Sequence, residues 1–149
     1  MVSFACAQDE CLNGRSIEYP GAHSRSAVSA YAEIHKKADA LAHFCMGTVY
    51  QKRDMLKEAL QEYGKALALD PGSASILLRV GMIQMSQKAF AQAQKTLQQA
   101  VTLDPDLYLG HVLLATVYYA QEKIESAIEE YKRAIHSDPD KLSPYLSLG

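Results

Sequence analysis

The dipeptide Asp-Pro recurs at a constant interval, and this recurrence constrains the fold more than any other feature of the sequence. The three pairs begin at Asp70, Asp104 and Asp138, 34 residues apart. Small and large residues recur at the same step, in the sets Gly47, Gly81 and Ala115; Leu56, Phe90 and Ile124; Ala59, Ala93 and Ala127; Tyr63, Leu97 and Tyr131; and Ala66, Ala100 and Ala134. A fixed period of this length indicates a repeat architecture, in which each unit buries its apolar face against its neighbours.

Two helices are predicted in each 34-residue unit. Between the Asp-Pro pairs, apolar residues return every three or four positions, as at Leu77, Val80 and Gly81 and again at Ala93, Leu97 and Ala100. This spacing is that of one face of an α-helix. Proline ends the second helix, because the residue before a proline is pushed out of helical geometry. The predicted N-caps of the next helices are Ser73, Asp106 and Asp140.

These features resemble the tetratricopeptide repeat (TPR), whose unit is a helix-turn-helix with a small and large pattern that ends in proline. The resemblance implies an all-α fold, a TPR-type right-handed superhelical solenoid of helix-turn-helix hairpins. Three repeats are expected at Ala40–Ser73, Ala74–Leu107 and Tyr108–Lys141, with a partial fourth-repeat helix over residues 142–149. The turn inside each hairpin departs from the family pattern, since the usual glycine is replaced by Asp54, Lys88 and Glu122.

The N-terminal region lacks this regularity. Residues 1–23 are expected to be a disordered arm, and residues 24–39 a preceding helix or a degenerate repeat. A break near residues 36–39 is favoured over one continuous helix. Cys6 and Cys11 are interpreted as free thiols. A cytoplasmic location is favoured, and a periplasmic or secreted one stays open if Ala5-Cys6-Ala7 is the remnant of a signal-peptide cleavage site.

Composition and motifs point away from catalysis. The formal charge of −2 gives no basic footprint for nucleic acid, and no apolar run is long enough for membrane insertion. The histidines show no metal-ligand spacing, and no phosphate loop or activated nucleophile is present. We therefore expect no enzyme activity, no cofactor and no metal. Cys45 is interpreted as a small buried hydrophobe, and Glu129 and Glu130 as exposed partners of nearby basic residues.

The resemblance further implies that the first helix of each repeat lines a concave groove that binds a peptide or helix of another protein. The groove positions carried over from the family are Leu41, Phe44, Thr48, Gln51 and Lys52 in the first repeat, Ser75, Leu78, Met82, Met85 and Ser86 in the second, and Leu109, Val112, Thr116, Tyr119 and Ala120 in the third. Arg79 is added to this predicted site as a charge that would orient the ligand. Most of these residues are apolar, and an exposed apolar patch usually marks a contact site.

The function expected from this pattern is a non-catalytic protein–protein interaction module, a scaffold or adaptor that holds an apolar peptide or helix. One alternative is a structural protein that forms a homo-oligomer through the groove or its C-terminal edge. Another is the recognition arm of a longer enzyme. Coverage of the groove by the chain's own N-terminal segment is also open. A clamp for chaperone tails is disfavoured, because the clamp positions map to Phe44, Thr48, Arg79, Leu109 and Leu113, and only Arg79 is suitably charged.

Overall fold

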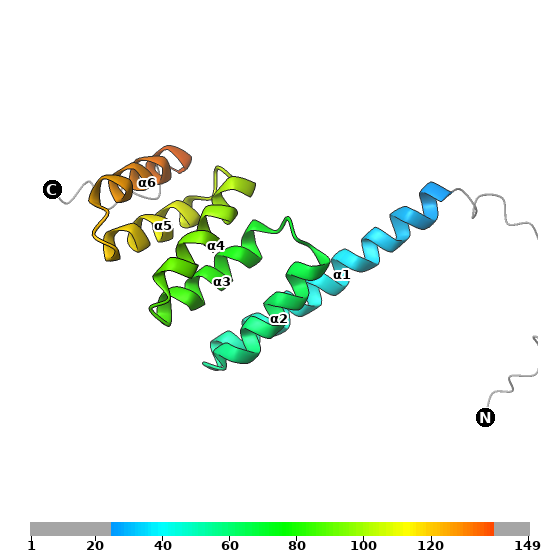
Figure 1. The fold of residues 1–149 in the computed structure, drawn as a ribbon. Coiled ribbons are helices and arrows are strands. Elements are labelled where there is room, and N and C mark those ends of the chain that lie inside the picture. Colours follow the sequence, from blue (N-terminus) through cyan, green and yellow to red (C-terminus); the bar gives the residue numbers. More distant parts are fainter. Residues whose placement is uncertain (1–24, 139–149) are drawn as a thin grey trace, which may run out of the picture. The chain divides into compact units, whose positions relative to one another are not determined.

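The computed structural model describes residues 25–138, and these residues fold into six α-helices (Figure 1). The helices are α1 (Arg25–Lys52), α2 (Leu56–Leu69), α3 (Ala74–Ser86), α4 (Phe90–Leu103), α5 (Tyr108–Ala120) and α6 (Ile124–Ser137). The chain divides into two units, Met1–Glu33 and Ile34–Gly149. The predicted N-terminal arm with Cys6 and Cys11, and the predicted fourth-repeat helix, lie outside the described residues.

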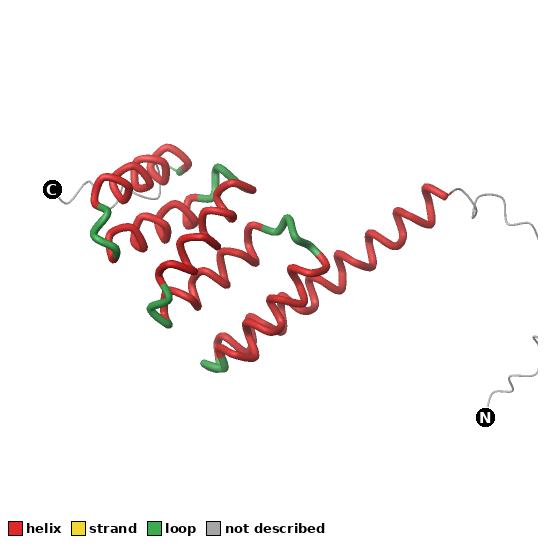
Figure 2. The backbone as a smooth tube through the Cα atoms, viewed as in Figure 1, coloured by secondary structure: helices red, strands yellow, loops and turns green. Residues whose placement is uncertain are grey.

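Three helical hairpins, joined by the short loops visible in Figure 2, make up residues 34–138 of the second unit. The C-terminal part of α1 pairs with α2 through contacts such as His43 with Glu62 and Phe44 with Tyr63. Likewise α3 pairs with α4, and α5 pairs with α6. The hairpins then stack in order, because α2 contacts α3 and α4 contacts α5. The helices α3 and α5 begin at Ala74 and Tyr108, the first residues of the predicted second and third repeats. An all-α solenoid of TPR type is therefore the observed architecture.

The turn inside each hairpin has the backbone conformation that glycine favours, although the residue there is not glycine. Asp54, Lys88 and Glu122 all have a backbone φ of 59–60°, the left-handed conformation that favours glycine. The amide of each donates to the carbonyl three residues earlier, as from Asp54 to Gln51 at 3.1 Å. The next amide reaches five residues back, as from Met55 to Tyr50 at 3.0 Å. This is a Schellman motif, and it leaves a strain of about 1 kcal/mol at each non-glycine residue.

The Asp-Pro pairs form the turns between hairpins. Pro71 and Pro105 each hold the second position of a four-residue turn. In the turn at Pro105, the amide of Leu107 donates to the carbonyl of Asp104 at 3.2 Å. The side chain of Asp104 also accepts a hydrogen bond from the amide of Asp106 at 3.2 Å. The predicted N-cap Asp106 is therefore wrong, because this turn moves the cap of α5 to Leu107. Ser73 does occupy the N-cap of α3, without a side-chain cap hydrogen bond.

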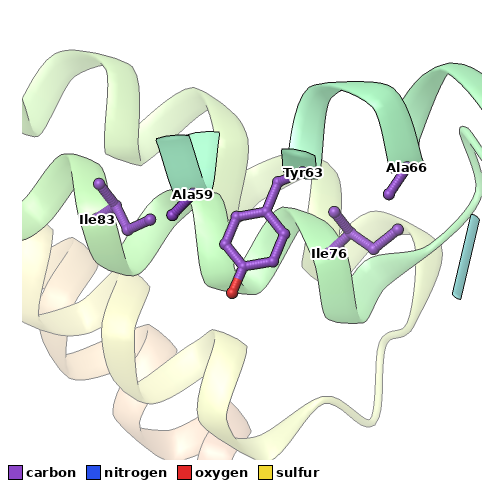
Figure 3. Close-up of a cluster of buried hydrophobic side chains, with 5 residues drawn as sticks. All are labelled: Ala59, Tyr63, Ala66, Ile76 and Ile83. Atoms are coloured by element: carbon purple, nitrogen blue, oxygen red, sulfur yellow. The ribbon is translucent and has the colours of Figure 1, made fainter. Parts of the chain in front are cut away.

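Small residues on the first helices let large residues of the second helices enter the core. A Cβ atom added to Gly47 would lie 2.6 Å from the Tyr63 ring, and one added to Gly81 would lie 2.7 Å from Leu97. Tyr63 and Leu97 are both fully buried. Figure 3 shows Tyr63 between Ala59 and Ala66 of its own helix, in one cluster with two isoleucines of α3. The recurrence of small and large residues is thus a recurrence of helix-to-helix contacts.

Two expectations for α1 are wrong. The break near residues 36–39 does not occur, since α1 is a single helix. Residues 25–46 contain neither glycine nor proline and are rich in alanine, the strongest helix former, so nothing in this segment interrupts the helix. Cys45 is exposed rather than buried. Leu41 and Met46, which are close to it in α1, are also exposed.

Candidate binding face on the first helices

The first helices of the second and third hairpins are almost without charge. Arg79 is the only Lys, Arg, Asp or Glu residue in α3 and α5 together, and His111 is their only histidine. The second helix of the third hairpin, α6, is richer in charge, with Glu125, Glu129, Glu130, Lys132 and Arg133, whereas α4 carries only Lys95. A helix that is apolar on nearly all sides is buried in a protein interior or presents its free side to another apolar surface.

The predicted groove residues lie on α1, α3 and α5, and they differ in exposure. Leu41, Leu109 and Tyr119 are 61%, 42% and 66% exposed. Lys52 and Thr116 are also exposed, while half-buried positions are held by Phe44, Thr48, Gln51, Arg79, Met82, Met85 and Val112. Leu78 is only 9% exposed and belongs to the core cluster with Ala93 and Leu97. It therefore offers little surface to a ligand.

The polar members of this face differ in how far their own fold already uses them. The Thr48 and Thr116 hydroxyls donate to the carbonyls of Phe44 and Val112, one turn back, at 3.0 and 2.9 Å. The Tyr63 hydroxyl donates to Gln51 Oε1 at 2.8 Å. Within residues 25–138, the charged ends of Lys52 and Arg79 have no partner. These two cations are the groups that remain free to orient a ligand.

One hollow in the structure includes predicted groove residues. It has a volume of about 420 Å³ and lies between α1 and the start of α3, where its lining includes Leu41, Phe44, Ser75 and Ile76. Lys37 and Asp70 add one charge of each sign at its wall. Phe44 itself packs against Tyr63, with ring centroids 5.8 Å apart. The structure thus brings Leu41 and Phe44 together at one hollow, whereas Leu109 and Tyr119 are exposed on α5.

Two larger hollows lie against the second helices, and the repeat accounts for both. Their volumes are about 600 and 610 Å³. The first includes Pro71 and Leu77, and the second includes Pro105 and His111, 34 residues further on in each case. Because the same space recurs at the same repeat position, we interpret it as a product of the turn between hairpins.

Sequence reasoning missed two hydrogen-bonded His–Glu pairs that occupy one repeat position. His43 Nδ1 lies 2.6 Å from Glu62 Oε2, and His111 Nδ1 lies 2.7 Å from Glu130 Oε2. The interpretation of Glu130 as exposed is wrong, since this residue is 6% exposed. The signal was present in the sequence, because both histidines precede their glutamates by 19 residues.

Each glutamate of these pairs also accepts a hydrogen bond from a basic residue one turn further along its own helix. The Lys65 ammonium donates to Glu62, and the Arg133 guanidinium donates to Glu130. The hydrogen bond from Lys65, followed by that from His43, holds the pKa of the Glu62 carboxyl below its usual value. His111 is further fixed by its other ring nitrogen, which lies 2.9 Å from the carbonyl oxygen of Pro105.

Stacked antiparallel hairpins with this contact pattern define the class of helical-repeat proteins. The tetratricopeptide repeat family model matches residues 52–109 and 84–148, which together make up more than half of the chain. The chain therefore belongs to the tetratricopeptide repeat family.

The chain is similar to parts of several larger proteins. It is 30% identical over 82 residues to small glutamine-rich tetratricopeptide repeat-containing protein 2 of Saccharomyces cerevisiae, covering 55% of this chain and 24% of that protein. It is 25% identical over 112 residues to the protein O-mannosyl-transferase TMTC1 of Homo sapiens, covering 72% and 13%. The chain thus spans about a quarter or less of the length of these curated relatives.

The fold is also that of solved TPR domains. The first TPR domain of Spaghetti (RPAP3), solved with the HSP90 peptide SRMEEVD, superposes with a TM-score of 0.67 at 23% sequence identity. The superposition covers 74% of this chain and 95% of that one. At this identity, the likeness shows the fold.

Residues 25–138 offer neither a membrane-spanning helix nor a metal site. None of the helices in this range has the length and apolar character needed to cross a membrane. In the same part of the chain, no three His, Cys, Asp or Glu side chains are grouped as a metal site would require.

Proposed function

We propose that this chain is a non-catalytic protein-interaction module that binds an apolar peptide or helix on the face formed by α1, α3 and α5. The observation that carries the proposal is the near absence of charge on α3 and α5, together with the exposure of Leu109 and Tyr119. Exposed apolar surface of this kind is stabilised when a partner removes it from water.

Different residues of the face have different roles in this proposal. Met82, Met85, Val112 and Tyr119 supply apolar contact, and the two methionines adapt to irregular partner surfaces. Leu78 contributes to the core beneath them. The free cations of Lys52 and Arg79 favour a partner that carries an acidic group beside its apolar residues. The partner is thus an amphipathic segment that is apolar on one side and acidic at one edge.

The HSP90 peptide bound by the Spaghetti domain provides a comparison ligand. Of the five clamp positions expected for chaperone tails, Phe44 and Leu109 present apolar side chains, and the Thr48 hydroxyl is bonded to its own helix. Only Arg79 offers a cation at such a position. We therefore propose that the peptide SRMEEVD is not a ligand of this chain, because the single cation of Arg79 cannot replace a clamp made of several polar and charged side chains.

The test is to select peptides from a random library on the immobilised chain and to titrate the best of them in solution. The double substitution Met82→Glu and Met85→Glu should lower its affinity by more than tenfold, because it places two carboxylates in an apolar contact. The single change Tyr119→Ser, at a residue that is 66% exposed, should weaken binding without loss of helical signal.

Leu103→Glu is the matched control, because Leu103 is 49% exposed on α4 and lies outside the proposed face. It should leave the affinity unchanged. The proposal fails if Tyr119→Ser and the methionine variant bind as well as the unmodified chain, or if Leu103→Glu weakens binding equally. Tight binding of SRMEEVD that depends on Arg79 would replace it with a chaperone-tail clamp.

A second role is that of a recognition arm within a longer enzyme. The match to part of an O-mannosyl-transferase supports this role. A recognition arm would use the same face on α1, α3 and α5. The selected peptide would then resemble a segment of the longer enzyme's substrate rather than a motif of an adaptor partner.

A further inference from the structure

Equivalent residues on the second helices differ sharply in burial, and the difference appears only in the last hairpin described. Tyr63 of α2 and Leu97 of α4 are both 0% exposed, whereas Tyr131 of α6, at the same repeat position, is 41% exposed. The neighbours of Tyr131 on the same face show the same exposure. This α6 outer face consists of Ile124, Ile128, Tyr131 and Ile135, which are 44%, 48%, 41% and 41% exposed.

The first helices show the mirror image of this pattern at the other edge. Ile83 of α3 and Val117 of α5 are 1% and 0% exposed, whereas Val49 of α1, at the same repeat position, is 42% exposed. Met46 is 48% exposed, while its equivalent Leu114 is 1% exposed. The α1 outer face, defined by Ala42, Met46 and Val49, is thus an apolar surface without a cover among residues 34–138.

The interior hairpins show what covers each kind of face. Tyr63 lies in one cluster with Ile76 and Ile83 of the following first helix. Leu97 lies in one cluster with Leu114 and Val117 of the following first helix. The outer face of each of these second helices is therefore buried against the first helix of the next hairpin. The outer face of that first helix is buried by the same contact. The α6 outer face fits a surface like the α1 outer face, and the chain carries both.

We propose that copies of this chain associate head to tail, with the α6 outer face of one copy packed under the α1 outer face of the next. Tyr131 of one copy then takes the place that Tyr63 and Leu97 hold inside the stack, and Val49 of the next copy takes the place of Ile83 and Val117. Such a contact is heterologous, so it does not close on itself after two copies, and the assembly grows with concentration. The face on α1, α3 and α5 stays open, which makes this inference independent of the proposed peptide binding.

Two single substitutions test the geometry by complementation. Val49→Lys disables the α1 outer face and leaves the α6 outer face intact, while Ile128→Lys does the opposite. Both residues are more than 40% exposed, so the fold should tolerate the change. Leu103→Lys, with the same charge change at a residue on neither face, is the control. Sedimentation velocity and light scattering give the mass over a wide range of concentrations, up to the solubility limit.

We expect the unmodified chain and Leu103→Lys to exceed the monomer mass of 16.4 kDa progressively as concentration rises. Each edge variant alone should stay at that mass, because it lacks one half of the contact. A mixture of the two edge variants should form a one-to-one complex of twice the mass and grow no further.

Three results would overturn the proposal. If the unmodified chain stays monomeric at all concentrations, then its own terminal residues, a different partner or water covers these faces. An edge variant that still dimerises alone means that like faces pair with like. A mixture that shows no complex means that the two faces do not meet each other. Circular dichroism of each variant separates loss of association from loss of folding.

Discussion

The first and third hairpins carry the same residue at several repeat positions, and at two of these positions the structure buries the residue in opposite hairpins. Tyr63 is fully buried in the first hairpin, whereas Tyr131 is 41% exposed in the third. The histidines are reversed, because the side chain of His43 is 36% exposed and that of His111 is 6% exposed. Identical residue types at one repeat position can therefore belong to the core or to the surface.

The neighbours in the stack account for this reversal. The tyrosine position is covered by the hairpin that follows, and α3 supplies that cover for Tyr63. The histidine position is covered by the turn that precedes, and Pro105 supplies that cover for His111. The residue equivalent to Pro105 before His43 is Lys37, which lies inside the continuous helix α1. Burial in a solenoid thus depends on the order of units as well as on sequence.

The largest effect expected from this comparison is at the tyrosine position. Tyr63→Ala should lower the free energy of unfolding by about 3–5 kcal/mol, because it leaves a large cavity and removes the hydroxyl that bonds Gln51. Tyr131→Ala should cost only about 1 kcal/mol, since much of its surface is already in water. Denaturant unfolding at low protein concentration, where any association is suppressed, measures both. Equal losses would show that the two positions are equally buried in solution.

At the histidine position, substitution in the third hairpin should cost more stability than substitution in the first. His111→Leu should destabilise the fold by about 3 kcal/mol, because it leaves the buried Glu130 carboxylate without one of its partners. His43→Leu should cost less than about 1 kcal/mol at its more exposed pair. The second hairpin supplies a rescue, since it carries Leu77 and Thr96 at these positions.

The rescue is the double variant His111→Leu and Glu130→Thr, which copies the second hairpin and removes the unpaired charge. Its unfolding free energy should recover most of the loss. If the double variant is no more stable than His111→Leu, the loss arises from poor packing of leucine and not from the stranded carboxylate.

The same substitution to alanine should change the stability of the fold in opposite directions at two glycines. Gly47→Ala should destabilise by about 1–3 kcal/mol, because the new methyl group would meet the fixed ring of Tyr63. Gly64→Ala should stabilise by about 1 kcal/mol, since nothing lies within 4 Å of its added Cβ atom and alanine is the better helix former. Thermal unfolding of both variants gives the signs. A stabilising Gly47→Ala would show that Tyr63 moves freely.

The smallest expected effect is the pH dependence of the stability that Glu62 contributes. The Glu62 carboxyl has a lowered pKa in the folded chain, so its contribution to stability is present above the usual carboxyl pKa and is lost as pH falls through the folded value. Glu62→Gln removes this contribution, so the difference in unfolding free energy from the unmodified chain should shrink as pH falls. Urea titrations at neutral and acid pH test this. A difference that does not change with pH would mean that Lys65 and His43 do not stabilise the charged form.

Much of the fold followed from the sequence, because local and repeated signals agreed. The starts of α3 and α5, the paired helices and the small-to-large contacts such as Gly47 with Tyr63 could all be predicted from the 34-residue step. The errors fell where one signal was missing. The continuous α1 lacked a helix breaker, and the cap of α5 was displaced by the hydrogen-bonded turn at Asp104.

The candidate binding face was less accessible to prediction than the fold. The resemblance to the family supplied its residues, but it could not separate Leu78, which is core, from Tyr119, which is 66% exposed. Both are apolar residues of first helices, and their difference arises from the contacts that α4 and α5 make around Leu78. The free state of the Lys52 and Arg79 cations likewise depends on which acidic side chains come near.

The sequence by itself determined the period, the helices and the residue that each helix offers at each repeat position. It did so because helix formation and turn geometry depend on residues close together in the chain. Only the tertiary structure decided which of three equivalent residues is covered, as at Tyr63, Leu97 and Tyr131. Burial depends on the hairpin that lies alongside, and the local sequence carries no information about whether such a neighbour is present.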